Sequence, residues 1–125
     1  MAKERGASIT GLDEIEAHDY QAARSYLLLI HDAKRVNGLI AKLRKAPITE
    51  FKAKDIFRAS QLSVLGISNF HVEKDRARIR KGKPLCSVLL VRDPDHGKVI
   101  IAYGYHRVCA VYGFDEDALI HCKIV

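Results

Sequence analysis

The segment that most constrains the fold is residues 100–113, IIAYGYHRVCAVYG, where an apolar strand runs into a glycine and then into a helix. Gly104 lets the backbone come close to a bound group at this turn. The first N–H groups of a helix have no partner within it, and the helix dipole is positive there. His106 and Arg107 add side-chain donors in the first turn. The segment predicts a strand–turn–helix unit that cradles an anion; a packing glycine beside a surface arginine is the alternative.

Length and composition are those of one globular domain. The chain has 125 residues, of which 48% are hydrophobic and 29% charged. We expect a flexible stretch over residues 1–10 and a single domain over 11–125. The longest apolar run, residues 26–30, is too short to span a membrane, and no secretory signal precedes it.

The cysteines indicate the compartment. Cys86, Cys109 and Cys122 are an odd number, form no C-x-x-C pair, and each lies in an apolar segment. We therefore expect buried free thiols and a cytoplasmic location.

Positive charge is concentrated in the middle of the chain. Residues 34–83 hold 14 basic and 4 acidic side chains, whereas the whole chain has a net charge of +6. Such a block favours contact with nucleic acid or another polyanion, and a solvated lysine-rich surface is the alternative.

The first part of the chain reads as a helical hairpin over residues 11–46. Asp19 is the expected N-cap of a helix that runs through Ile30, and Asp32 is the expected N-cap of a second helix that Pro47 closes. Apolar residues recur on one face of both helices, so the hairpin must cover another element.

The remaining residues, 50–125, are expected to form a core of the α+β class. Val72 and Ile79 anchor an otherwise charged helix. The expected elements are a strand that runs into a helical turn within 51–59, a helix over 70–81, strands over 86–91 and 99–102, a helix over 105–112 capped by Gly113, and a strand over 119–125.

The acidic residues give weak signals for catalysis. Glu73 and Asp75 are interpreted as surface charges that alternate with basic residues on their helix. Residues 115–117 are interpreted as a solvated loop. We predict no metal site, since the neighbours His121 and Cys122 point to opposite sides of a strand.

The basic segment over residues 76–83 is the best candidate for contact with nucleic acid. Its cationic side chains are able to neutralise several phosphates, but no interleaved aromatic residues indicate base stacking. The candidate residues are Arg76, Arg78, Arg80 and Lys81.

Residues 50–125 resemble the ParB/sulfiredoxin-like superfamily. Sulfiredoxins carry Gly-Cys-His-Arg at the strand–helix turn and end in a strand of the type Ile-Pro-Ala-Lys-Leu-Val, and ParB-type proteins have Gly-Glu-Arg-Arg at that turn. This chain has Gly-Tyr-His-Arg over 104–107, a helix, and Ile-His-Cys-Lys-Ile-Val over 120–125. The resemblance implies an α+β core with a small mixed sheet and helices, and it leaves the helical hairpin outside.

The resemblance implies a site for a nucleoside triphosphate, such as ATP or CTP with Mg²⁺, and NTPase, phosphotransfer or nuclease activity as in relatives. Gly104, His106 and Arg107 match the phosphate-contacting positions of the motif, within which Tyr105 lies. Lys83, near the start of the preceding strand, is a further candidate.

Two departures from the superfamily weigh against turnover. Tyr105 stands where sulfiredoxins have their reactive cysteine, and Tyr103 stands where related sequences often have an acidic residue. Tyrosine, with a pKa of about 10, is a poor base and a poor Mg²⁺ ligand at neutral pH. If that acid is essential, the chain binds a nucleotide without acting on it.

Two further classes of function stay open. One is a non-enzymatic module that binds DNA, without sequence specificity, or protein through residues 34–83; we expect it to lack the helix-turn-helix domain with which ParB-type proteins read DNA. The other is a partner-binding protein whose helical hairpin forms a homodimer or a docking face.

Overall fold

A computed structural model describes residues 15–63, 70–81 and 87–125. The expectations for residues 1–10, Lys83 and Cys86 lie outside these ranges. The elements are α1 (Ala17–Leu27), α2 (Ala33–Lys45), β1 (Thr49–Lys52), α3 (Ala53–Ser60), α4 (Phe70–Arg80), β2 (Val88–Asp93), a 3₁₀ turn (Pro94–His96), β3 (Lys98–Tyr103), α5 (Tyr105–Phe114) and β4 (Leu119–Ile124). The predicted α+β class is confirmed.

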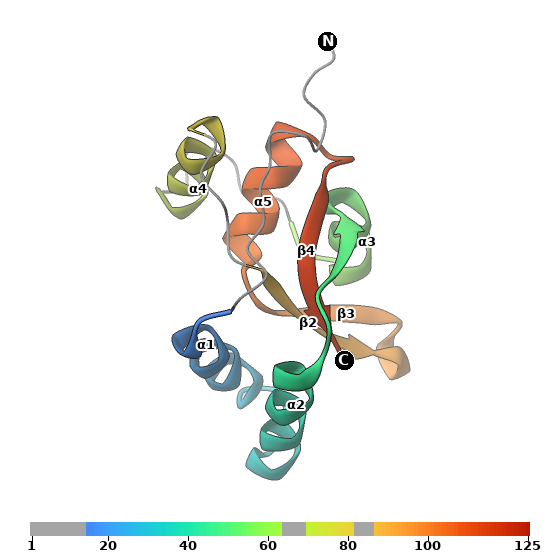
Figure 1. The fold of residues 1–125 in the computed structure, drawn as a ribbon. Helices are drawn as coiled ribbons and strands as arrows, with labels where there is room; N and C mark the ends of the chain where they lie inside the picture. The colour runs from blue at the N-terminus through green and yellow to red at the C-terminus, as the bar shows by residue number, and fades with distance from the viewer. Residues whose placement is uncertain (1–14, 64–69, 82–86) are drawn as a thin grey trace.

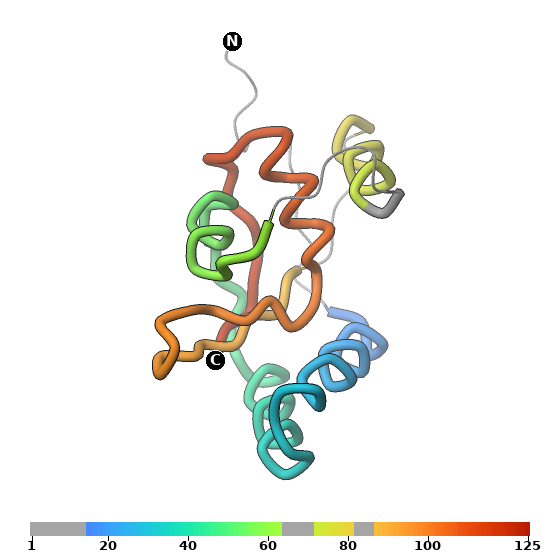
Figure 2. The backbone as a smooth tube through the Cα atoms, turned by 180° about the vertical axis from the view of Figure 1, so that it is seen from behind, coloured from blue at the N-terminus to red at the C-terminus, as the bar shows by residue number. Residues whose placement is uncertain are grey.

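A mixed sheet forms the centre of the fold. Within the described residues its four strands lie in the order β1-β4-β2-β3. Strand β4 runs parallel to β2 and antiparallel to β1, and β2 runs antiparallel to β3, which lies at the edge. The helices α1 and α2 lie together on one side of the sheet, and α3, α4 and α5 lie on the other (Figures 1 and 2).

The central strands are apolar on both faces because each face is covered by helices. Leu89 and Ile100 pack with the core residues of α1 and α2, whereas their neighbours Leu90 and Ile101 pack with those of α3, α4 and α5. Successive side chains of a strand point to opposite faces, so a sheet buried on both faces needs continuous apolar runs. The strand β2 has such a run, since its first four residues are all buried.

The hairpin of α1 and α2 covers the sheet, as its apolar face predicts. Asp32 caps α2, and its Oδ1 accepts a hydrogen bond of 2.8 Å from the Arg35 N–H. The prediction for α1 was wrong at both ends: the N-cap is Glu16, and the helix ends at Leu27. Asp19 lies inside the first turn with a fully buried side chain, so its carboxylate faces the core instead of capping the helix.

Gly113 does not end the last helix, contrary to the prediction. The helix α5 continues to Phe114, and Asp115 is its C-cap. A Cβ atom at position 113 would lie 2.8 Å from Nη1 of Arg76. The glycine therefore makes room for an arginine side chain where α4 crosses α5, and it is not a helix terminator.

The described cysteines are buried thiols outside any disulfide, as predicted. Neither Cys109 nor Cys122 forms a disulfide, and burial raises the pKa of the Cys122 thiol to about 12. The thiol is protonated at neutral pH, so Cys122 is a core residue and not a nucleophile. Among the described residues, every helix is too short or too polar to cross a membrane.

Candidate functional site

The turn between β3 and α5 requires glycine for its backbone and for its packing. Gly104 has φ of 103°, a region that residues with a side chain rarely adopt. A Cβ atom at this position would also lie 2.9 Å from Cγ2 of the buried Val88 on β2. Fold requirements alone therefore account for the glycine. Any role in binding has to come from what surrounds the turn.

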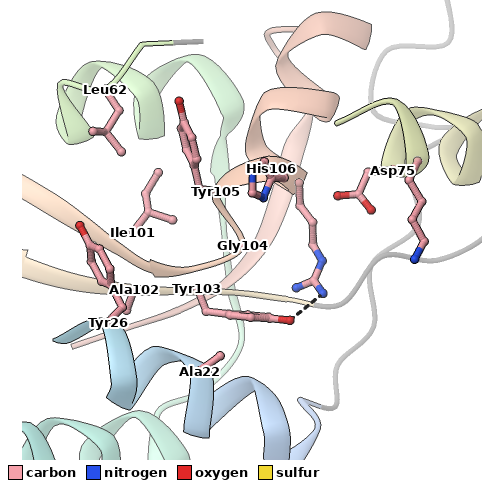
Figure 3. A pocket seen from close by; sticks show the side chains of 12 residues that line it. Ala22, Tyr26, Leu62, Asp75, Ile101, Ala102, Tyr103, Gly104, Tyr105 and His106 are labelled. Carbon is pink, nitrogen blue, oxygen red and sulfur yellow. Dashed lines mark hydrogen bonds between the residues drawn. The ribbon is translucent and has the colours of Figure 1, made fainter. Parts of the chain in front are cut away.

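A pocket of about 680 Å³ opens at this turn, between α1, α4 and the β3–α5 unit (Figure 3). Figure 3 shows Tyr26 and Leu62 at one end of the pocket and Asp75 at the other, with His106 on the Asp75 side. The lining residues are Ala22, Tyr26, Leu62, Lys74, Asp75, Ile101, Ala102, Tyr103, Gly104, Tyr105, His106 and Arg107. The pocket thus has an apolar half and a charged half.

The first turn of α5 faces the charged half. The first hydrogen bond within this helix runs from the Val108 N–H to the Gly104 carbonyl at 3.1 Å. The amides of the three residues before Val108 therefore have no acceptor within the helix, and the positive end of the helix dipole lies at the pocket.

Arg107 is held against Tyr103. Its guanidinium carbon lies 4.9 Å from the centre of the Tyr103 ring, and Nη2 donates a 3.4 Å hydrogen bond to the Tyr103 hydroxyl (Figure 3). The other terminal nitrogen, Nη1, is buried and has no hydrogen-bond acceptor among the described residues. A buried charged donor without an acceptor is costly to leave unsatisfied, so this nitrogen favours an anionic ligand.

Tyr103 lies between Arg107 and the buried Asp19 of α1. Burial raises the pKa of the Tyr103 hydroxyl, and the Asp19 carboxylate raises it further, although Arg107 opposes the change. The phenol is therefore neutral at physiological pH. Because Asp19 belongs to the hairpin, this contact connects α1 to the wall of the pocket.

Tyr105 closes the other side of the turn. Its hydroxyl donates a hydrogen bond to the Ser63 carbonyl, in the segment that follows α3. Burial raises the pKa of its hydroxyl, so this donor stays protonated at neutral pH. The bond ties the first residue of α5 to the chain beside Leu62, at the apolar end of the pocket.

Asp75 is a site residue that the sequence interpretation missed. The structure separates it from Glu73, which pairs with Arg80 at 2.7 Å. Asp75 instead lines the pocket, and burial raises the pKa of its carboxyl against the attraction of Arg107, Arg78, His106 and Lys74. Its spacing carried the signal, because positions 72, 75 and 79 lie on one helical face and both apolar members are buried.

The predicted nucleic-acid residues differ in exposure and in their ion pairs. The Arg76 side chain is only 22% exposed and packs at Gly113, and Arg80 is engaged by Glu73. Arg78 and Lys81 are exposed. Lys83 lies outside the described residues. The structure brings Lys74 to the pocket.

Within the described ranges, three side chains are close enough to share a metal ion, namely Glu16, His18 and Asp19. His18 already lies between the two carboxylates, with Nδ1 3.7 Å from Glu16 and Nε2 3.0 Å from Asp19. The pairing accounts for the cluster without an ion. The neighbours His121 and Cys122 are separated as predicted, since His121 contacts Glu50 at 3.0 Å and Cys122 is fully buried.

Comparison with known proteins gives no match to a family model, a curated protein or a solved structure.

Proposed function

We propose that this protein binds a nucleotide whose phosphates sit at the first turn of α5, as the resemblance to the ParB/sulfiredoxin-like superfamily implies. The observation that carries the proposal is the buried Nη1 of Arg107, a cationic donor without an acceptor in the described residues, at the edge of a 680 Å³ pocket. A phosphate oxygen is the acceptor that a guanidinium in this position favours.

Several positive features converge on the same end of the pocket. The first-turn amides of α5 and the positive end of its dipole lie there, and so do the side chains of His106, Arg107 and Lys74. Together they complement two or three negative charges better than a single carboxylate. Mg²⁺, when bound through the phosphate oxygens, would offset part of the remaining charge next to Asp75.

The apolar half of the pocket favours a nucleoside over inorganic phosphate alone. Tyr26 and Leu62 are 43% and 46% exposed, and they flank Ile101 at the end away from Asp75 (Figure 3). Aromatic and aliphatic walls of this kind accommodate a base and a sugar, and the total volume is in the range of small-molecule sites. The pocket therefore suits a ligand with a charged end and a flat apolar end.

The test is a thermal-shift and calorimetric titration with ATP, CTP and GTP, each with Mg²⁺, and with inorganic triphosphate as a probe of the charged end. We expect at least one nucleotide to raise Tm and to bind more tightly than triphosphate. Ligand at 100 times its Kd stabilises the fold by about 2.7 kcal/mol. No stabilisation at millimolar concentration by any of the three nucleotides contradicts the proposal.

Arg107→Ala tests the observation that carries the proposal. Loss of a charge-assisted hydrogen bond costs about 1.5–3 kcal/mol, so binding should weaken about 10- to 100-fold. Arg58→Ala is the matched control, because Arg58 lies on α3, is 83% exposed, and is not among the pocket residues. Equal nucleotide affinities of the two variants would show that Arg107 does not contribute to binding.

A further inference from the structure

Among the described residues, Asp75 is the acidic side chain that lines the pocket. It lies on α4 between the buried Val72 and Ile79, and its carboxylate faces the end of the pocket where His106 lies (Figure 3). The other acid of this helix, Glu73, forms ion pairs with Arg80 at 2.7 Å and with Arg76 at 3.9 Å. The two acids of one helix thus have different surroundings, and only Asp75 lines the pocket.

We propose that Asp75 accepts the proton of a water molecule that attacks the terminal phosphoryl group of the bound nucleotide. A bond forms between the water oxygen and the γ-phosphorus, and the bond from that phosphorus to the β–γ bridging oxygen breaks. The bridging oxygen leaves with the electron pair on the nucleoside diphosphate, and the water proton moves to Asp75. The products are inorganic phosphate and a nucleoside diphosphate.

Three other ionisable groups in or beside the pocket are less suited to this role. Burial raises the pKa of the Tyr103 hydroxyl, so it holds its proton at neutral pH. Asp19 is fully buried on α1 and is not among the residues that line the pocket. Arg107 is always charged. Asp75 combines access to the pocket with a carboxyl whose pKa is raised by burial, and a base with a pKa nearer to the working pH is the more effective one.

The inference rests on the proposed function, and one set of variants separates the two. Release of phosphate from ATP, CTP and GTP with Mg²⁺ is measured for the wild-type chain, Asp75→Asn, Asp75→Glu and the matched control Glu73→Gln. Binding of the same nucleotides is measured by calorimetry. Glu73→Gln removes the same charge from the same helix outside the pocket.

We expect wild-type hydrolysis of at least one nucleotide, a loss of about 100-fold or more in Asp75→Asn, partial rescue in Asp75→Glu, and no change in Glu73→Gln. Nucleotide affinity of Asp75→Asn should be equal or higher, because a negative charge beside the phosphates is removed.

A pH profile gives a second readout. The wild-type rate should rise as Asp75 loses its proton, with Arg107, Arg78, His106 and Lys74 as the ionisable neighbours that face it from α5 and α4. In Asp75→Asn this rise of the rate with pH should be absent.

The outcomes are distinguishable. Nucleotide binding without hydrolysis by the wild-type chain overturns the role of Asp75 and leaves the binding proposal standing. Hydrolysis that persists in Asp75→Asn, or falls equally in Glu73→Gln, also overturns it. Absence of binding contradicts the proposed function itself.

Discussion

Replacing Gly104 by alanine tests the description of the turn on which the pocket is built. Two costs add at this position. Backbone strain destabilises a residue with a side chain at φ of 103° by about 1–3 kcal/mol. Overpacking of a Cβ 2.9 Å from Val88 Cγ2 destabilises the fold by about another 1–3 kcal/mol. The smaller conformational entropy of the unfolded chain with alanine offsets about 0.4–1 kcal/mol of this destabilisation. We expect Gly104→Ala to lower the free energy of unfolding by about 1–6 kcal/mol.

Two other glycines separate the contributions. Gly97 also has a positive φ, 64°, but a Cβ there meets nothing within 4 Å, so Gly97→Ala should cost only the backbone strain. Gly38 lies within α2 with open space around it, and Gly38→Ala should stabilise the chain by about 0.5–1 kcal/mol.

Urea unfolding followed by far-UV circular dichroism suits this series, because the chain has no tryptophan. A double-mutant cycle with Val88→Ala removes the two methyl groups nearest the new Cβ, and a coupling of about 1–2 kcal/mol is expected. If Gly104→Ala lowers the free energy of unfolding no more than Gly97→Ala, or if the cycle shows no coupling, then Gly104 does not pack closely against Val88.

Three further predictions concern a helix cap, a buried acid and the basic block. Asp32→Ala removes the acceptor for the Arg35 N–H and should lower the free energy of unfolding by about 1 kcal/mol, measured in urea; an unchanged midpoint would contradict the cap. Asp75→Asn should raise Tm relative to wild type, by an amount that grows as pH rises through the raised pKa of Asp75 and vanishes at acidic pH where the wild-type carboxyl is protonated; a gain independent of pH would count against burial as the cause. If the basic block binds duplex DNA, affinity should fall steeply with salt, and replacing Arg78 and Lys81 by alanine should lower the slope of log K against log salt by about 0.9 for each phosphate that is no longer neutralised; binding that is independent of salt would exclude it.

The predictions from sequence succeeded where a local rule decides the structure. Asp32 caps α2 because an aspartate just before a helical apolar pattern is well placed to accept a hydrogen bond from a first-turn N–H. Val72 and Ile79 are buried because they are the apolar members of a charged helix. The strand–glycine–helix order around Gly104 follows from the residue pattern in the same way, whereas the mixed sheet is expected only from the resemblance.

The misses share a physical cause. Residue type alone predicts a cap at Asp19, a surface charge at Asp75 and a helix end at Gly113. Each instead has a position set by tertiary packing, since Asp19 lies against Tyr103, Asp75 lines a pocket and Gly113 admits Arg76. An interpretation that treats every charged residue as outward-facing overlooks an acid spaced like the buried residues of its helix, as Asp75 is with Val72 and Ile79.

The position of Tyr26 and Ala22 in the pocket wall has a thermodynamic consequence. Both belong to α1, so a ligand that contacts them binds only while the hairpin is docked on the sheet. Ligand binding and hairpin docking are then linked equilibria. The free energy by which a ligand prefers the docked hairpin adds to the free energy needed to undock it. Hydrogen exchange of the amides in α1 therefore reports on a ligand held at the far end of the pocket.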